Sequence, residues 1–299
     1  MSHKPGARAG KPAWLKKQLP RGGDYARVTR LLAGAKLHTV CQEANCPNMF
    51  ECFSKDTATF MILGDQCTRN CRFCNITARP PLDVDPREPD RVARAVRELR
   101  LQYVVVTSVT RDDLPDGGAA HFAAVIQAIK TLGKEMDQTI RVEVLIPDFK
   151  GDMAALKTVV DANPDVINHN METVAALYPR VRPEAVYQRS LDLISSAKKL
   201  NPDMPAKSGI MVGLGETASQ LEQTMQDLFA HGCDMLTMGQ YLQPTRHHLD
   251  VQKYYPPAEF EHLEQTARNI GFTKVAAGPF VRSSYRAEEL FQKPEHLSV

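Results

Sequence analysis

TFMILGDQCTRNCRFC, residues 59–74, is an apolar run followed at once by three cysteines. The run at 59–64 has the length and the apolar, partly β-branched composition of a buried strand. In β/α barrels and in open α/β sheets, the loops beyond the carboxyl ends of the strands form the active site. We therefore expect one sheet edge to hold the three cysteines of this loop, which are Cys67, Cys71 and Cys74.

The rest of the chain alternates between strand and helix patterns. Five further strand-like runs lie at 103–109, 140–147, 165–170, 207–214 and 235–242. Amphipathic helical segments separate them, at 89–100, 119–133, 151–162, 187–200 and 217–232. Thr217 as an N-cap and Gly232 as the residue after the end mark the last helix. Six β/α units in series predict a parallel sheet, either a partial barrel or a doubly wound sheet.

The two ends of the chain have their own patterns. Residues 1–30 are rich in Lys, Arg and Pro, and we expect an extended arm, which is solvated or contacts an acidic partner. Residues 256–271 begin with two prolines and predict a helix, and 274–285 predict a short strand that runs into a loop. We divide the chain into an N-terminal arm at 1–56, a barrel at 57–255 and a C-terminal extension at 256–299.

Composition narrows the function classes. The chain has 299 residues, of which 43% are hydrophobic and 24% charged, so it is long and apolar enough for a large core. Its 37 Lys and Arg nearly balance its 35 Asp and Glu, which argues against a nucleic-acid partner. No apolar run approaches the roughly 20 residues of a membrane span, and the N-terminus lacks the apolar region of a signal peptide. We expect a cytoplasmic protein with no membrane partner.

The cysteines indicate metal. Six of the seven fall within 34 residues, which in a reducing compartment favours metal binding over disulfides. Three thiolates on one loop can bind an iron–sulfur cluster and leave its fourth iron without a protein ligand. Structural zinc is the alternative, but it prefers paired cysteines two residues apart with a fourth ligand. The simplest partition is two clusters, one on the loop and one on Cys41, Cys46 and Cys52, with Cys233 as a buried apolar residue.

Three segments carry a resemblance to a known family. CTRNCRFC at 67–74, including Phe73, resembles the cluster motif of the radical S-adenosylmethionine (SAM) superfamily. CQEANCPNMFEC at 41–52 and GPFVRSSYRA at 278–287 narrow the resemblance to the lipoyl synthases. It implies an α/β fold, a partial (β/α)6 TIM-like barrel whose N- and C-terminal extensions close over the barrel mouth.

The resemblance also implies a reaction. Two [4Fe-4S] clusters and SAM would serve a transferase that inserts sulfur at C6 and C8 of a protein-bound octanoyl-lysine to form the lipoyl cofactor. Its partners would be octanoylated lipoyl carrier domains, namely 2-oxoacid dehydrogenase E2 subunits and the glycine cleavage H protein, with ferredoxin or flavodoxin as electron donor and an iron–sulfur carrier. The alternatives are another two-cluster radical SAM sulfur-inserting enzyme and, from a different class, a zinc-stapled binding protein.

The resemblance assigns cluster ligands, of which Cys67, Cys71, Cys74 and Ser284 would also be the catalytic residues. Cys67, Cys71 and Cys74 would bind the cluster that holds SAM. The auxiliary cluster, which donates the sulfur, would be bound by Cys41, Cys46, Cys52 and a serine, Ser284 in preference to Ser283. An alkoxide is a harder ligand than a thiolate, so that corner can open when a sulfide is attacked. Without the resemblance, two serines near a C-terminus indicate only a cap or a turn.

Polar residues at strand ends are candidate ligand contacts. The SAM candidates are Phe73, Thr107, Ser108, Asp112, Asn168, Asn170, Glu172, Gly213, Gly215 and Glu216. The substrate candidates are Arg111, Gln240, Tyr241 and Arg282. The alternatives are an ordinary glycine turn at 213–217 and a solvated salt bridge of Arg111 and Asp112. We expect His247 and His248 to be surface or packing residues.

Overall fold

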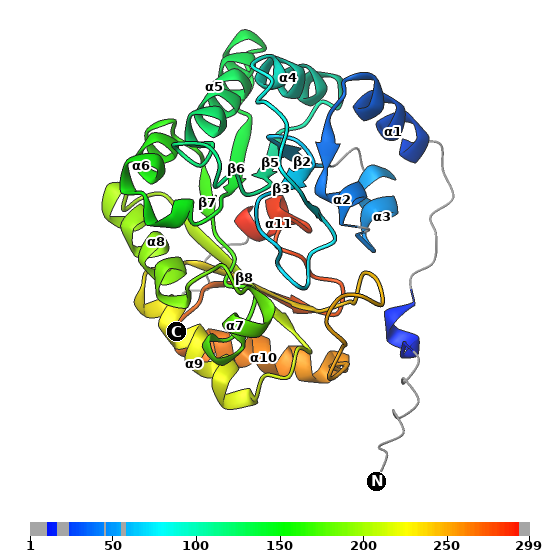
Figure 1. The fold of residues 1–299 in the computed structure, drawn as a ribbon, viewed down its shortest axis with the longest axis vertical. Helices are drawn as coiled ribbons and strands as arrows, with labels where there is room; N and C mark the ends of the chain where they lie inside the picture. Colours follow the sequence, from blue (N-terminus) through cyan, green and yellow to red (C-terminus); the bar gives the residue numbers. More distant parts are fainter. Residues whose placement is uncertain (1–10, 17–23, 45, 55–57, 293–299) are drawn as a thin grey trace.

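One curved sheet runs through the computed structural model, with its strands in the order β1-β2-β5-β6-β7-β8-β9-β10 (Figure 1). The structure describes residues 11–16, 24–44, 46–54 and 58–292. The strands are β1 (His38–Thr39), β2 (Thr59–Ile62), β5 (Tyr103–Ser108), β6 (Arg141–Leu145), β7 (Val166–Asn168), β8 (Ala206–Val212), β9 (Met235–Gln240) and β10 (Lys274–Gly278). All neighbours from β2 to β10 pair in parallel, and β1 pairs antiparallel to β2. Because β1 and β10 are the two edges of the sheet, the barrel is partial, as predicted.

Helices cover the outer face of this sheet (Figure 1). They are α4 (Glu88–Glu98), α5 (Ala119–Glu135), α6 (Met153–Asp161), α8 (Tyr187–Leu200), α9 (Ala218–Ala230) and α10 (Pro257–Ile270). Five lie where the amphipathic pattern predicted a helix, and α10 lies where two prolines predicted the start of one. Thr217 caps α9 in a capping box with Gln220, and Gly232 follows its end with a φ of 83°. The capping residues predicted from the sequence therefore mark both ends of α9.

Alternation along the strands divides the core into two layers. Val104 and Val106 of β5 are fully buried in the layer beneath the outer helices. Tyr103 and Val105 point the other way, into the barrel, where they pack against Ala287. Because both faces are covered, the parallel strands read as nearly continuous apolar runs.

The N-terminal region corrects one prediction. The prediction of an extended arm up to residue 30 was wrong, because Asp24–Gly34 forms helix α1. Its Val28 and Leu32 are fully buried, and Tyr25 stacks on Phe53 with ring centroids 5.6 Å apart. Because Val28 and Leu32 are four residues apart, they lie on one apolar face of the helix. The basic composition of this segment had instead indicated an unfolded arm. Of the earlier part of the predicted arm, 1–10 and 17–23 lie outside the described residues.

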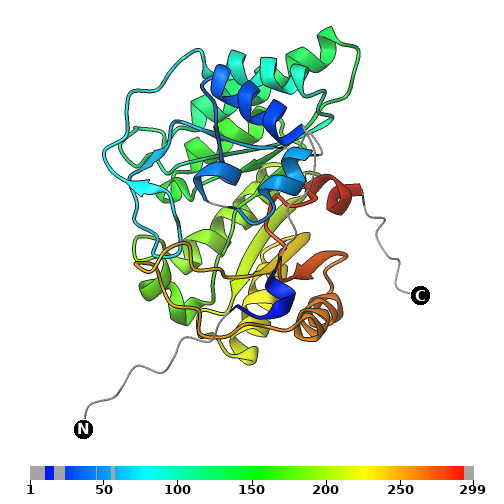
Figure 2. The same cartoon turned by 90° about the vertical axis from the view of Figure 1, so that its right-hand side faces the viewer.

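The C-terminal segment reaches both ends of the barrel. After β10 it passes close to the carboxyl ends of the strands and then forms α11 (Ala287–Gln292). This helix packs on residues at the opposite ends of the strands, including Val166 and Met235. Figure 2 shows the red α11 and the cyan cysteine loop on opposite sides of the molecule. The C-terminal extension therefore also closes the barrel floor, which the sequence did not predict.

Within the described part of the chain, no helix is both long enough and apolar enough to cross a bilayer.

Candidate iron–sulfur site

The cysteine loop leaves the barrel at the carboxyl end of β2. Leu63 and Gly64 have φ values of 67° and 90°, so the chain turns sharply out of the sheet. Two short strands, β3 (Gln66–Cys67) and β4 (Thr77–Ala78), then pair in parallel and join the two ends of the loop. The geometry places Cys67 beyond the carboxyl end of β2. Its sulfur accepts backbone N–H bonds from Arg69, at 3.5 Å, and from Thr110, at 3.3 Å.

The three thiols of this loop lie close enough to affect one another. The pKa of Cys74 is raised to about 12, first by burial and then by the neighbouring thiols of Cys71 and Cys67. Burial also raises the pKa of Cys71, against the opposing charge of Arg182. Iron binds thiolates, so binding here releases protons and offsets this burial cost. The donor set therefore fits an iron–sulfur cluster with three protein ligands.

Cys41 and Cys52 of the upstream triplet lie on two short helices, α2 (Val40–Glu43) and α3 (Met49–Ser54), and Cys46 lies between the helices. Thr39 caps α2, and the backbone N–H of Cys46 donates to the carbonyl of Cys41 at 3.0 Å, which bends the chain between the helices. Burial raises the pKa of Cys41 to about 12, and the thiols of Cys46 and Cys52 contribute to the increase. These three sulfurs form a second donor set on a separate segment.

Neither triplet has the geometry of a single-ion site. In the described ranges, no three Cys, His, Asp or Glu side chains converge closely enough to hold one metal ion. Ligands of a tetrahedral zinc crowd around one atom, whereas the thiolates of a cluster bind different irons and lie farther apart.

The C-terminal segment meets the upstream triplet through side-chain bonds. The amide of Asn48 donates to the carbonyl of Phe280 at 2.7 Å. The Tyr285 hydroxyl donates to Glu51 at 2.7 Å, and Arg286 pairs with the same carboxylate at 3.3 Å. The serines of the RSSY segment therefore lie beside the segment that carries Cys46 and Cys52.

Those two serines differ in their bonding. The Ser283 hydroxyl accepts a hydrogen bond from the Asn170 amide at 3.2 Å. Within the described part of the chain, the Ser284 hydroxyl makes no such bond. The Ser284 oxygen is therefore the freer of the two to act as a ligand.

Charged residues lie between the two triplets. Glu172 has a φ of 66° and accepts from the Asn170 amide at 3.0 Å. Burial raises the pKa of Glu172, while Arg182 and Arg282 oppose the increase. The charge of Glu172 also acts on Cys71 and Cys74, and that of Arg282 interacts with Cys46. These interactions place both triplets around one polar region of the barrel mouth.

Arg182 is a site residue that the sequence analysis missed. It follows the short helix α7 (Tyr178–Val181) and donates to the carbonyls of Asn170, at 2.8 Å, and Met171, at 3.1 Å. Its Nε is buried and has no hydrogen-bond partner among the described residues. A basic residue after an unpredicted single-turn helix gives no local signal of this role.

Three predicted SAM contacts at the carboxyl ends of strands have a buried polar atom to spare. Ser108 Oγ, Asn168 Oδ1 and Asn170 Oδ1 are buried without a partner among the described residues. Asn168 uses its amide nitrogen to bind Glu143 at 3.0 Å. Buried polar atoms without partners are rare, so these three mark a surface suited to a polar ligand.

Other predicted contacts are bonded within the protein. Thr107 donates to the Leu145 carbonyl, and Glu216 accepts from the N–H groups of its own turn, where Gly213 and Gly215 have positive φ. The side-chain amide of Gln240 makes four bonds to backbone groups, and the Tyr241 hydroxyl donates to the Leu249 carbonyl. Phe73 packs on the apolar cluster around Tyr241.

In the charged loop after β5, Arg111 is buried and Asp112 half-buried, in contrast to the predicted solvated salt bridge. Arg111 is 2% exposed and pairs with Asp113 at 2.8 Å. Asp112 pairs with Arg69 at 2.7 Å. The alternative that joined Arg111 to Asp112 was therefore wrong in its partners and its exposure.

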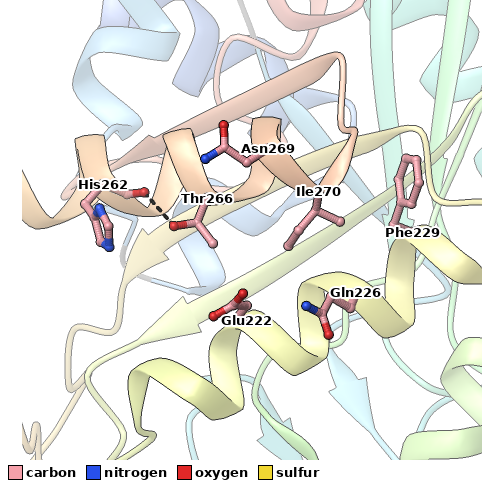
Figure 3. Close-up of a pocket in the computed structure, with 7 residues that line it drawn as sticks. All are labelled: Glu222, Gln226, Phe229, His262, Thr266, Asn269 and Ile270. Carbon is pink, nitrogen blue, oxygen red and sulfur yellow. Dashed lines mark hydrogen bonds between the residues drawn. The ribbon is translucent and has the colours of Figure 1, made fainter.

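The remaining candidates lie outside both donor sets. His247 is exposed, and His248 donates to the carbonyl of Cys74 at 2.9 Å, so it packs against the cysteine loop. Cys233 is 2% exposed, as predicted. A groove of about 620 Å³ lies between α9 and α10, lined by residues such as Glu222 and His262 (Figure 3). It is on the outer face of the barrel, away from the cysteines.

Comparisons with known proteins give consistent results. Residues 61–228 match the model of the radical SAM superfamily, and residues 1–46 match the N-terminal domain of lipoyl synthase of that family. The lipoyl synthase of Desulfotalea psychrophila is 55% identical over 288 residues, which cover 96% of this chain and 95% of that protein. The lipoyl synthase of Rubrobacter xylanophilus is 52% identical over 282 residues, 94% of this chain and 87% of that protein.

Solved structures share the fold at low sequence identity. HydG, a maturase of the [FeFe]-hydrogenase, superposes with a TM-score of 0.59 at 14% identity, covering 90% of this chain and 67% of its own. SuiB from Streptococcus suis, bound to its precursor peptide SuiA, has a TM-score of 0.50 at 13% identity, covering 73% of this chain and 48% of its own. At such identity the likeness concerns the partial barrel alone.

Proposed function

The chain belongs to the lipoyl synthase family of the radical SAM superfamily, and we propose that it inserts two sulfur atoms, at C6 and C8, into an octanoyl chain carried on a protein lysine. Membership makes it an enzyme that uses SAM and iron–sulfur clusters. The observation that carries the proposal is the convergence of two cysteine triplets, from separate segments, on one end of the barrel. A single-cluster radical enzyme needs only one such triplet.

We assign a ligand role to each donor set. Cys67, Cys71 and Cys74 hold the cluster that binds SAM, and Cys41, Cys46 and Cys52 hold the auxiliary cluster with Ser284 as its fourth ligand. When bound, the first cluster with SAM supplies hydrogen-atom abstraction from an unactivated carbon, and the second supplies sulfur. Among the described residues the Ser284 hydroxyl beside the upstream triplet has no hydrogen-bond partner, whereas Ser283 accepts a hydrogen bond from Asn170, and this difference supports the assignment.

The protein's own residues suit the polar end of SAM. The methionyl part of SAM carries a carboxylate and an ammonium group. Arg182 has a buried donor without a partner in the described ranges, and Glu172 is an acceptor close to Cys71. Ser108, at the end of β5, and Asn168 and Asn170, at and after the end of β7, add acceptors. We propose that these side chains hold SAM against the loop cluster.

The barrel floor excludes water from this region. Lys207 and Glu143 are completely buried and pair at 2.8 Å, and the Tyr103 hydroxyl donates to the same carboxylate at 2.7 Å. Helix α11 covers this network from below. A closed floor leaves the mouth as the route for an alkyl chain, and a dry site protects a reactive carbon centre from side reactions.

The proposal includes partners and a compartment. The substrate is an octanoylated lipoyl carrier domain, of a 2-oxoacid dehydrogenase E2 subunit or a glycine cleavage H protein. A ferredoxin or flavodoxin supplies electrons, and an iron–sulfur carrier rebuilds the auxiliary cluster. None of the seven cysteines forms a disulfide bond in the structure, which suits a reducing compartment such as the cytoplasm.

Anaerobic assay with mass spectrometry tests the function. The iron-loaded protein is incubated with SAM, a reductant and an octanoyl-lysyl peptide. We expect 5′-deoxyadenosine and a peptide mass gain from two sulfur atoms. Methylthio transfer would instead indicate the alternative sulfur-inserting enzyme, and a colourless protein with zinc would indicate the binding protein. Absence of both products despite full iron loading contradicts the proposal.

A further inference from the structure

Arg69 lies in the cysteine loop between Cys67 and Cys71, yet it is only 5% exposed. Its guanidinium forms a fork on Asp112, with Nε 2.7 Å from Oδ2 and Nη2 2.9 Å from Oδ1. The same Nη2 lies 2.6 Å from Oδ1 of Asp148. Three short charge-assisted bonds therefore join the middle of this loop to two carboxylates.

The two carboxylates lie in loops that follow two neighbouring strands of the barrel. Asp112 lies in the loop after β5, and Asp148 follows β6. Asp148 caps the 3-10 turn η2 (Phe149–Gly151), in which Phe149 and Lys150 have φ values of 45° and 52°. Residues other than glycine adopt such left-handed φ values only at a cost in free energy. Contacts with the surrounding protein must therefore hold this turn in place.

Asp148 is ionised in this setting. Its side chain is fully buried, which alone would raise its pKa, but the hydrogen bond and charge of Arg69 outweigh burial and hold the pKa below its usual range. Arg189 of α8 contacts its other oxygen at 3.2 Å. The carboxylate is thus shared by one arginine from the cysteine loop and one from the outer helix layer.

Further hydrogen bonds link the loop after β5 to the sulfur of Cys67. The Thr68 hydroxyl donates to the Thr110 carbonyl at 2.9 Å and accepts from the Asp112 N–H at 3.1 Å. The N–H of Thr110 donates to Cys67 Sγ at 3.3 Å. The loop after β5 therefore both binds the cysteine loop and supplies a donor to one of its sulfurs. Hydrogen bonds to ligand sulfurs help to set the potential of an iron–sulfur cluster.

We propose that Arg69 is a positioning residue, whose bonds to Asp112 and Asp148 hold the cysteine loop on the barrel rim and fix the N–H···S bonds to Cys67. This inference rests on the proposed function, because it concerns the cluster assigned to that loop. Asp112, predicted from the sequence as a SAM contact, becomes part of the loop anchor instead. Removing such an outer partner typically costs about 10- to 100-fold in affinity or activity.

Matched glutamine variants test the inference. Arg69→Gln and Arg189→Gln each remove one arginine from Asp148, but only the first detaches the cysteine loop. Both proteins are reconstituted with iron and sulfide and compared with wild type by redox titration followed by electron paramagnetic resonance, with and without SAM. Thermal unfolding and 5′-deoxyadenosine formed per bound iron complete the comparison.

We expect both variants to unfold at lower temperature, while only Arg69→Gln changes the potential of the loop cluster and weakens the SAM-dependent change in its spectrum. Its 5′-deoxyadenosine yield per iron should fall about 10-fold or more. Arg69→Lys keeps the positive charge but lacks the planar guanidinium fork. Its cluster potential and its 5′-deoxyadenosine yield should therefore lie between those of Arg69→Gln and Arg189→Gln. Equal potentials and SAM responses in Arg69→Gln and Arg189→Gln would overturn the inference.

Asp112→Asn covers the case in which Arg69→Gln does not fold. Asp112 is partly exposed, and Arg69 keeps its contact with Asp148 after this change, but the fork on Arg69 is broken. It should shift the potential in the same direction as Arg69→Gln, and an unchanged potential contradicts the inference. A wild-type chain that binds no iron would count against the proposed function, not against the anchor.

Discussion

Asn48 and Phe280 are 232 residues apart in the sequence, yet the Asn48 amide donates a 2.7 Å hydrogen bond to the Phe280 carbonyl. Asn48 is 1% exposed, so this bond lies in the protein interior. It joins the segment of the upstream cysteines to the segment of the two serines. The proposed auxiliary site is thus assembled from both ends of the chain.

Asn48→Ala should loosen that junction. Deleting the amide removes a buried bond, which we expect to cost about 1–3 kcal/mol of unfolding free energy in urea titrations. Iron at the auxiliary site and sulfur insertion should fall, while 5′-deoxyadenosine formation persists. Gln243→Ala is the control, because its amide donates to the His248 carbonyl at 2.8 Å on another loop. Wild-type iron content and sulfur insertion in Asn48→Ala would argue against the junction's role.

The two cysteine triplets should fail in different ways. Cys67→Ala, Cys71→Ala or Cys74→Ala removes a ligand of the cluster that holds SAM, and should abolish 5′-deoxyadenosine. Alanine at any upstream position, Cys41, Cys46 or Cys52, should spare SAM cleavage but abolish sulfur insertion, both read by mass spectrometry.

Cys233→Ala serves as the control for the triplet variants. This cysteine is buried beside β9 and belongs to neither donor set, so both activities should stay near wild type. The division of labour is refuted if SAM cleavage is lost equally in the two sets of variants.

Periodicity in the sequence was enough to predict the six central strands and the helices between them. β5, predicted at 103–109, spans Tyr103–Ser108, and α9 begins directly after its predicted cap. In elements of this length the apolar residues recur with the period of the strand or helix, because one face is buried. A single sequence is therefore enough to predict them. Short elements carry too few residues for a period, so β1 and α11 gave no such signal.

Side-chain partners were the harder part of the site. The position of Asp112 at a strand end was predictable, but its pairing with Arg69 depends on two loops meeting across the barrel rim. Arg182 reaches the site from a single-turn helix for the same reason. Local sequence specifies where a strand ends, whereas these contacts depend on how non-adjacent loops pack.

Lowering the pH should destabilise the fold through His169. Its ring is 3% exposed, with Nδ1 2.9 Å from the Ile146 carbonyl and Nε2 2.9 Å from Ser190. Burial, followed by the charge of Arg182, lowers its pKa from 6.5 to about 4, with Asp148 opposing. The unfolded chain binds this proton at higher pH than the folded one, so stability is full above pH 6.5 and falls towards pH 4.

The loss in that window should be about 3 kcal/mol. Urea unfolding at several pH values measures it, with His169→Gln as the comparison. The variant can retain polar contacts but does not titrate, so its stability should change much less between pH 6.5 and 4. An identical pH slope in both proteins would rule out His169 as the cause. The low-pKa carboxylate of Asp148 contributes only at lower pH, because its unfolded value is 3.8.

Gly239→Ala should separate the barrel from the auxiliary site. Gly239 lies in β9, and a Cβ there would overlap the carbonyl oxygen of Val281 as the C-terminal segment enters the barrel. Backbone cannot yield as a flexible side chain does, so we expect a cost of about 1–3 kcal/mol and a displaced segment at Ser284. SAM cleavage should persist while sulfur insertion and auxiliary iron are lost. Gly34→Ala is the matched control, since a Cβ at Gly34 meets no atom within 4 Å, and it should keep both activities. Full sulfur insertion by Gly239→Ala would show that the close approach of Val281 to β9 is not needed to place the serine ligand.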